Sequence, residues 1–126
     1  MPNPHDQAQA VLSEWAQRFN AGEIEPLAAL YANDALLLGT SSPELYVGQQ
    51  SLERYFRLNA QVTIEHFEVR SIAAGILLCA GFYTFVRNPT TSPVTVPARF
   101  SFVFVQKDGE WRILHHHSSA LPPPRR

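Results

Sequence analysis

The sequence predicts an α+β fold in which helices cover one face of a curved antiparallel sheet. Two observations support this prediction. Apolar residues recur at helical spacing up to residue 59, and beyond it they fall in long stretches rich in β-branched and aromatic side chains. Helices followed by a meander of strands are typical of the α+β class. Because 126 residues suffice for one core, we expect residues 1–126 to form a single domain.

The first expected element is an amphipathic helix with an apolar stripe over residues 8–19. Asn3 is suited to cap its start, and Pro4 fits the first helical position. Gly22 supplies the left-handed residue that ends it. A second, shorter helix is expected to start at Pro26 and to pack through Leu27, Leu30 and Tyr31.

The next segment is expected to form a short buried strand, Ala35–Leu38, and a loop of turn residues, Gly39–Pro43. A third helix should follow Gly48, with one face made of Leu52, Tyr55, Phe56 and Asn59. The four long strands expected after it cover residues 62–72, 76–87, 94–107 and 110–119. Residues 121–126 are expected to be a proline-rich tail, because three consecutive prolines cannot donate to a strand ladder.

Asp108 and Gly109 are typical of a two-residue hairpin turn, which sets the register of the last two strands. Counting back from this turn predicts one aromatic face with the pairs Phe104–Ile113, Phe102–His115 and Phe100–His117. The other face would hold the pairs Val103–Leu114, Ser101–His116 and Arg99–Ser118. A single β-bulge would exchange the two faces beyond it, so the pairs nearest the turn are the best defined.

In this register His115 and His117 share the aromatic face and are the candidate catalytic residues. Two imidazoles at the mouth of an apolar cavity are suited to bind an anion or to transfer protons near neutral pH. The alternative is that both are ordinary histidines at the end of a core strand. A structural metal site needs four ligands, and only these two share a face, so we expect no metal and no cofactor.

Arg99 interrupts an otherwise apolar strand, and we expect its guanidinium to need a partner that compensates its burial. That partner is either a carboxylate on a neighbouring strand, such as Glu65 or Glu68, or an acidic ligand. Tyr55 and Tyr83 are expected to be core aromatics whose hydroxyls are suited to contact a ligand in a cavity.

Charge and cysteine content limit which partners the protein is expected to bind and where in the cell it is expected to lie. The formal net charge is −1, so nothing favours nucleic acid or a membrane surface as a partner. A lone cysteine excludes a disulfide framework, and we expect Cys79 to be a buried apolar residue. Residues 1–6 have neither a basic start nor an apolar run, so a cytoplasmic location is expected.

Three segments resemble the nuclear-transport-factor-2-like (SnoaL-like) superfamily, and most of all its calcium/calmodulin-dependent protein kinase II association domains. They are residues 20–23 (Asn-Ala-Gly-Glu), Gly48 with residues 55–56 (Tyr-Phe), and residues 108–119, whose tryptophan and His-x-His are the most specific part. The resemblance implies a cone of curved sheet closed by helices, a pocket inside each cone, and a homodimer or larger assembly. It also implies that Arg99 corresponds to a pocket arginine.

Our leading hypothesis is a dimeric pocket protein that binds a small acidic ligand through Arg99, His115 and His117. The alternatives are a non-catalytic oligomerisation module and an isomerase- or cyclase-type enzyme of the SnoaL-like kind, since the superfamily includes both. Whether the chain is an enzyme stays open, because one fold supports many activities.

Overall fold

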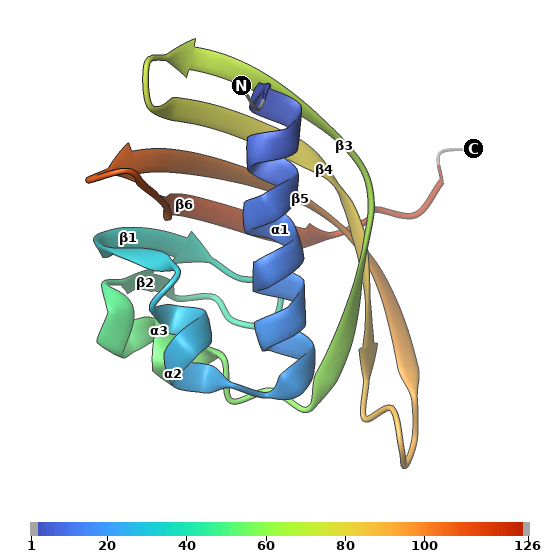
Figure 1. Cartoon of the computed structure of the whole chain (residues 1–126). Helices are drawn as coiled ribbons and strands as arrows, with labels where there is room; N and C mark the ends of the chain where they lie inside the picture. Colours follow the sequence, from blue (N-terminus) through green and yellow to red (C-terminus); the bar gives the residue numbers. More distant parts are fainter. Residues whose placement is uncertain (1–2, 125–126) are drawn as a thin grey trace.

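The computed structural model describes residues 3–124, so two arginines of the tail, Arg125 and Arg126, lie outside the described residues, as do residues 1–2. It confirms the α+β class, with a sheet that curves around one long helix (Figure 1). The helices are α1 (Pro4–Ala21), α2 (Ile24–Ala28) and α3 (Gln49–Tyr55). The strands are β1 (Tyr31–Leu38), β2 (Leu45–Val47), β3 (Ala60–Ala73), β4 (Ile76–Arg87), β5 (Val94–Lys107) and β6 (Glu110–Ala120).

The sheet has six strands in the order β2-β1-β6-β5-β4-β3. The four strands β3 to β6 form the predicted antiparallel meander, whereas β1 lies parallel to β6 and pairs with β2 on its other side. Tyr31 is the first residue of β1 and does not lie on the second helix as expected, and β2 was not predicted. That helix is only five residues long, and the Leu30 carbonyl accepts a hydrogen bond from the Ile113 amide (2.9 Å), so the chain joins the sheet from Tyr31.

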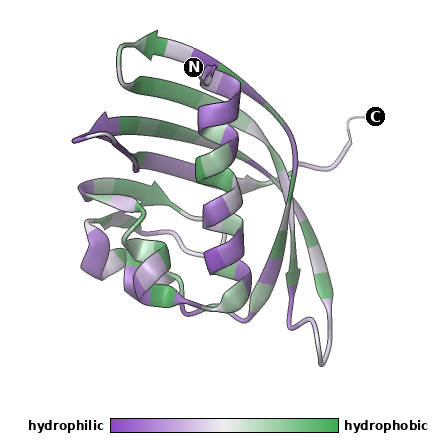
Figure 2. Cartoon of the chain, viewed as in Figure 1, coloured by the Kyte–Doolittle hydropathy of each residue, from purple (hydrophilic) through white to green (hydrophobic). Residues whose placement is uncertain are grey.

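The core lies between α1 and the concave face of the sheet. Asn3 caps α1 through a hydrogen bond from the Asp6 amide to its Oδ1 (2.8 Å), and Gly22 ends it with a φ of 69°, as predicted. Along the strands hydrophobic and hydrophilic residues alternate, which separates an inner from an outer face (Figure 2). The inner side chains of β5, Phe100, Phe102 and Phe104, are all buried.

A β-bulge at Leu114 changes the predicted register of the last hairpin. The turn at Asp108 and Gly109 has positive φ values of 53° and 80°, and the pairs next to it are as predicted up to Phe104–Ile113. Beyond that point Leu114 is the extra residue, and the next pairs are Val103–His115, Phe102–His116 and Ser101–His117. All five pairs predicted beyond Phe104–Ile113, on both faces, are therefore wrong.

Candidate functional site

His116 is the histidine of the triplet that faces the interior of the cone. It lies opposite Phe102, is 2% exposed, and stacks on the Phe102 ring at 3.9 Å between centroids. His115 and His117 point to the outer face, because adjacent side chains of a strand alternate. The predicted inner pair is thus replaced by one buried imidazole, since the bulge moves every residue beyond Leu114 to the opposite face.

Both ring nitrogens of His116 are hydrogen-bonded to tyrosine hydroxyls. Nδ1 lies 2.8 Å from the hydroxyl oxygen of Tyr31, and Nε2 lies 3.0 Å from that of Tyr83. The Tyr31 oxygen also accepts a hydrogen bond from the indole Nε1 of Trp15 at 3.0 Å. Four residues from α1, β1, β4 and β6 therefore form one buried polar network, which satisfies the buried polar groups of these aromatic side chains.

Burial keeps this network uncharged. It lowers the pKa of His116 well below its ordinary value, and the neighbouring His115 and His117 lower the pKa further. Burial also raises the pKa of the Tyr31 and Tyr83 hydroxyls above the ordinary range, so both are neutral phenols. A neutral imidazole has one donor and one acceptor nitrogen, which matches its two tyrosine partners.

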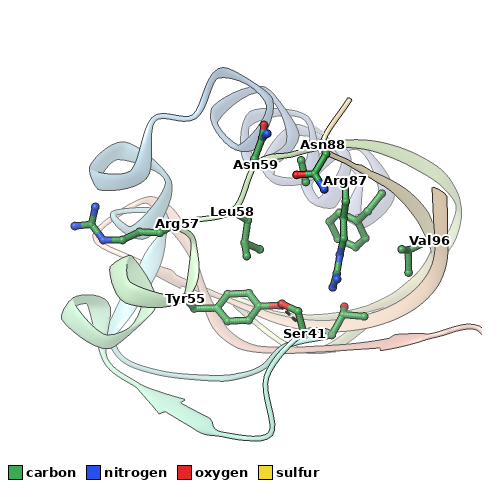
Figure 3. Close-up of a pocket in the computed structure, with 11 residues that line it drawn as sticks. Ser41, Tyr55, Arg57, Leu58, Asn59, Arg87, Asn88 and Val96 are labelled. Atoms are coloured by element: carbon green, nitrogen blue, oxygen red, sulfur yellow. Dashed lines mark hydrogen bonds between the residues drawn. The ribbon is translucent and has the colours of Figure 1, made fainter. Parts of the chain in front are cut away.

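A cavity of about 350 Å³ opens at the end of the cone near α3, and we call it the mouth cavity (Figure 3). One part of its wall is apolar, with Leu58, Phe85 and Val96, and another carries the hydroxyls of Thr40 and Ser41. The full set of lining residues is Thr40, Ser41, Tyr55, Arg57, Leu58, Asn59, Ala60, Phe85, Arg87, Asn88 and Val96. None of them is an aspartate or a glutamate.

Arg87 supplies the positive charge of the mouth cavity. It is the last residue of β4, and its guanidinium points into the cavity, whereas that of Arg57 points away from it (Figure 3). None of the ion pairs among residues 3–124 involves Arg87. The rim next to it is held by a hydrogen bond from the Asn88 amide to the Asn59 carbonyl (2.9 Å).

A smaller space of about 20 Å³, which we call the inner chamber, lies beneath the mouth cavity. Tyr55, Leu58 and Phe85 line both spaces, so they form the partition between them. The inner chamber is lined in addition by Tyr83, His116 and Ser118, and its size suits about one water molecule. The partition therefore separates an open, positively charged mouth from the His116 network.

The structure brings only two of the five predicted ligand-binding residues to the interior. Tyr55 and Tyr83 line the inner chamber, and Tyr55 also lines the mouth cavity. Arg99, His115 and His117 share the outer face of the sheet. There Arg99 and His117 border a shallow hollow near the edge strand β3.

Arg99 is exposed, contrary to the expectation of a buried guanidinium. Alternation turns Ala98 and Phe100 inward and Arg99 outward, where its Nε donates to the Ser119 hydroxyl at 3.4 Å. The two suggested carboxylate partners lie in other contacts. Glu65 accepts a hydrogen bond from the Thr84 hydroxyl (3.0 Å), and Glu68 pairs with His66 (2.8 Å) and Arg70.

Sequence reasoning missed Arg87, Thr40 and the inward orientation of His116. Nothing local distinguishes Arg87 as a cavity residue, because the mouth cavity joins residues 40–41, 55–60, 85–88 and 96 from separate elements. Within residues 3–124 no group of three or more His, Cys, Asp or Glu residues is placed to hold a metal ion. Over the same residues, no helix has the length and apolar character needed to cross a membrane.

Comparison with known proteins places this geometry in a family. The model of the SnoaL-like domain matches residues 8–123. A structure from Xanthomonas campestris, assigned as a calcium/calmodulin-dependent protein kinase II association domain, is 31% identical, with a TM-score of 0.89, covering 96% of this chain and 90% of the other. No curated protein matches the sequence significantly.

Two further structures share the fold at lower identity. The hub homology domain of this kinase from Chlamydomonas reinhardtii is 20% identical, with a TM-score of 0.78 and coverage of 95% of this chain and 100% of the other. A ketosteroid isomerase-like protein from Erwinia carotovora atroseptica is 19% identical, with a TM-score of 0.75 and coverage of 93% and 95%. The chain is thus similar in structure both to association domains and to an isomerase-like protein. With the family model matching almost its whole length, the chain belongs to the SnoaL-like domain family, within the nuclear-transport-factor-2-like superfamily.

Proposed function

We propose that this protein binds a small amphiphilic carboxylate in the mouth cavity. The observation that carries the proposal is Arg87, whose guanidinium points into the cavity while no acidic side chain lines it (Figure 3). A guanidinium binds carboxylates through its planar set of donors, and such charge-assisted hydrogen bonds are stronger than neutral ones. This keeps the predicted acidic ligand but replaces Arg99 by Arg87 as its charged partner.

The apolar residues that line the mouth cavity indicate the chemistry of the part of the ligand beyond its carboxylate. Phe85, Leu58 and Val96 lie on the walls around Arg87, so a ring or short hydrocarbon chain is buried there when the carboxylate reaches the guanidinium. Burying apolar area contributes roughly 25 cal/mol per Å². Pockets that combine mostly apolar walls with a few polar groups are typical of small-molecule sites.

Isothermal titration calorimetry with benzoate and benzylamine tests this proposal. We expect benzoate to bind, benzylamine not to bind, and Arg87→Gln to weaken benzoate by about tenfold or more, the worth of a charge-assisted hydrogen bond. Arg57→Gln is the matched control, because this arginine lines the cavity but points away from it (Figure 3). Equal binding of benzoate by wild type and Arg87→Gln would contradict the proposal.

The pH dependence of benzoate binding distinguishes a site at Arg87 from one at His115 and His117. Arginine stays protonated and benzoate stays ionised between pH 6 and 8, so binding through Arg87 should not change over this range. Binding that weakens as the pH rises would indicate an imidazole of the outer face instead, since an imidazole is positively charged only while it is protonated.

Assembly into a homodimer is a second candidate function, and the outer face of the sheet favours it. Apolar side chains lie on this face on β2, β1, β5 and β4, and His115 and His117 of β6 lie between those of β1 and β5. Those that are 37–57% exposed are Leu36, Leu38, Leu45, Val47, Leu78 and Phe82. Sheets of this kind pack face to face, and the similarity to association domains supports a second copy as the partner.

Light scattering tests the homodimer. We expect a dimer mass or larger at micromolar concentration, and dissociation on Leu78→Glu, which places a charge beside Val103 on the outer face. Leu121→Glu is the control, because this leucine is exposed to a similar degree but lies after β6. A monomer mass for the wild type would contradict the dimer and leave the cavity proposal unaffected.

A further inference from the structure

We infer that the Tyr55 ring sets the depth of the mouth cavity, so that the site selects carboxylates that carry a single ring or a short chain. This inference rests on the proposed function, because it names the residue that limits the ligand of the same cavity. The feature that carries it is the partition between the mouth cavity and the inner chamber, to which Tyr55, Leu58 and Phe85 contribute. Tyr55 is the last residue of α3, and the chamber behind it reaches His116 of β6.

The Tyr55 ring is held by contacts on several sides. It lies over Gly39, where it occupies the space that a Cβ would need. Its centroid lies 5.1 Å from that of Tyr46 and 5.3 Å from that of Phe56, and both pairs are edge-on. At the far end of the ring, the hydroxyl oxygen accepts a hydrogen bond from the Ser41 hydroxyl at 3.3 Å (Figure 3). Together these contacts define one position for the ring, across the floor of the mouth cavity.

The other two members of the partition do not close it by themselves. Leu58 is 43% exposed, so a large part of its side chain faces solvent. Phe85 packs against Tyr83, with 4.6 Å between ring centroids, and against Phe19 at 5.5 Å, so it belongs to the wall of the core. Removal of the Tyr55 ring would therefore remove a part of the partition that neither of them replaces.

The side chains behind the ring are not free to fill its place. Gly39 has no side chain, and the His116 ring is held by hydrogen bonds to the hydroxyls of Tyr31 (2.8 Å) and Tyr83 (3.0 Å). When a large side chain is truncated in such surroundings, they relax only in part and a cavity remains. Engineered cavities of about 150 Å³ bind benzene, so a space left by an aromatic ring accommodates a ring of a ligand. Tyr55→Ala should thus join the mouth cavity to the inner chamber.

The position of the partition determines which part of a ligand is buried. When Arg87 holds the carboxylate, Phe85 and Leu58 lie beside the first ring, as in the proposed function. Tyr55 blocks further extension toward His116, so a second ring must point to the opening of the cavity. A ring that stays in solvent contributes little, because the hydrophobic gain is proportional to the apolar area that is buried. Larger carboxylates therefore gain no affinity from their additional size.

Isothermal titration calorimetry with benzoate and 2-naphthoate tests the depth of the site through the ratio of their affinities. Wild-type protein should bind the two within about threefold of each other, whereas Tyr55→Ala should bind naphthoate about tenfold more tightly than benzoate, because the second ring is then buried. Tyr55→Phe keeps the ring and should keep the wild-type ratio. Val96→Ala is the matched control, because it enlarges the mouth cavity at a wall outside the partition and should not change the ratio.

A crystal structure of the variant tests the partition without a ligand. We expect one continuous cavity from the mouth to His116 in Tyr55→Ala, and side chains that close the space again would overturn the inference. Tyr55→Leu keeps an apolar contact with Phe56 and is the second variant if Tyr55→Ala does not fold. Its ratio of affinities should lie between those of wild type and Tyr55→Ala. Melting temperatures establish that each variant is folded.

The outcomes separate the inference from the proposed function. If benzoate binding is lost in Arg87→Gln but Tyr55→Ala keeps the wild-type ratio, the role of Tyr55 is wrong and the cavity proposal stands. Wild-type protein that binds naphthoate tenfold more tightly than benzoate would also overturn the limit on depth. If wild-type protein binds neither ligand, the proposed function and the ligand class fail together. The crystal structure of the variant then still decides whether Tyr55 forms the partition.

Discussion

Acidification from pH 7 to 5 should destabilise the protein mainly through His116. Burial lowers the pKa of His116 well below 6.5, so the folded state holds this imidazole neutral in that range. The unfolded chain exposes the same imidazole, which takes up a proton as the pH falls below about 6.5. Below that pH the unfolded state binds one more proton than the folded state, and the free energy of unfolding decreases as the pH falls.

The size of the effect follows from this single proton. A difference of one bound proton changes the free energy of unfolding by about 1.4 kcal/mol per pH unit, which gives a loss of about 2 kcal/mol at pH 5. Chemical denaturation followed by circular dichroism at several pH values between 7.5 and 5 measures it. Most carboxylates remain ionised over this range, so their contribution is small.

Glutamine substitutions identify the histidine that is responsible. His116→Gln removes the titrating group and should flatten the pH dependence, whatever its own effect on stability. His115→Gln should reduce the slope only slightly, since burial and His117 lower the pKa of this partly exposed histidine too. Identical slopes for wild type and His116→Gln would refute the reasoning.

Three further predictions concern close packing. Burial raises the pKa of the Cys79 thiol to about 12, so native protein at pH 8 should react with a disulfide reagent only as fast as it unfolds, and rapid labelling would contradict this. The Tyr55 ring lies directly over Gly39, so Gly39→Ala should lower the free energy of unfolding by about 1–3 kcal/mol in denaturation experiments. In a Tyr55→Ala background the same substitution should lower it much less, and equal losses in both backgrounds would refute the contact. A Cβ at Gly81 would lie 2.6 Å from the Phe67 Cα, and because backbone cannot rotate aside, Gly81→Ala should lower the melting temperature more than Gly39→Ala does.

Local sequence patterns were sufficient to predict most of the fold. Strands β4 and β5 have the predicted bounds, because long runs of β-branched and aromatic residues end at turn residues on both sides. The capped start of α1 at Asn3 and its end at Gly22 also follow from local chemistry. β2 was missed because it has only three residues and depends on pairing with β1, which is a contact distant in the sequence.

The candidate site was harder to predict because it depends on a single inserted residue. Nothing in the sequence around Leu114 marks it as the bulge, and three consecutive histidines give no pattern that shows which one faces inward. The burial of Phe102 and the hydrogen bonds of His116 to Tyr31 and Tyr83 fix the register in three dimensions. Packing between distant elements, rather than alternation along one strand, decides the inner face.

The position of a bound carboxylate tests the central claim most directly, and a crystal structure of the protein soaked with benzoate measures it. The account predicts the carboxylate within hydrogen-bond distance of the Arg87 guanidinium inside the mouth cavity, with the ring against Phe85. Benzoate bound on the outer face beside Arg99 and His117, with the mouth cavity free of it, would contradict the account.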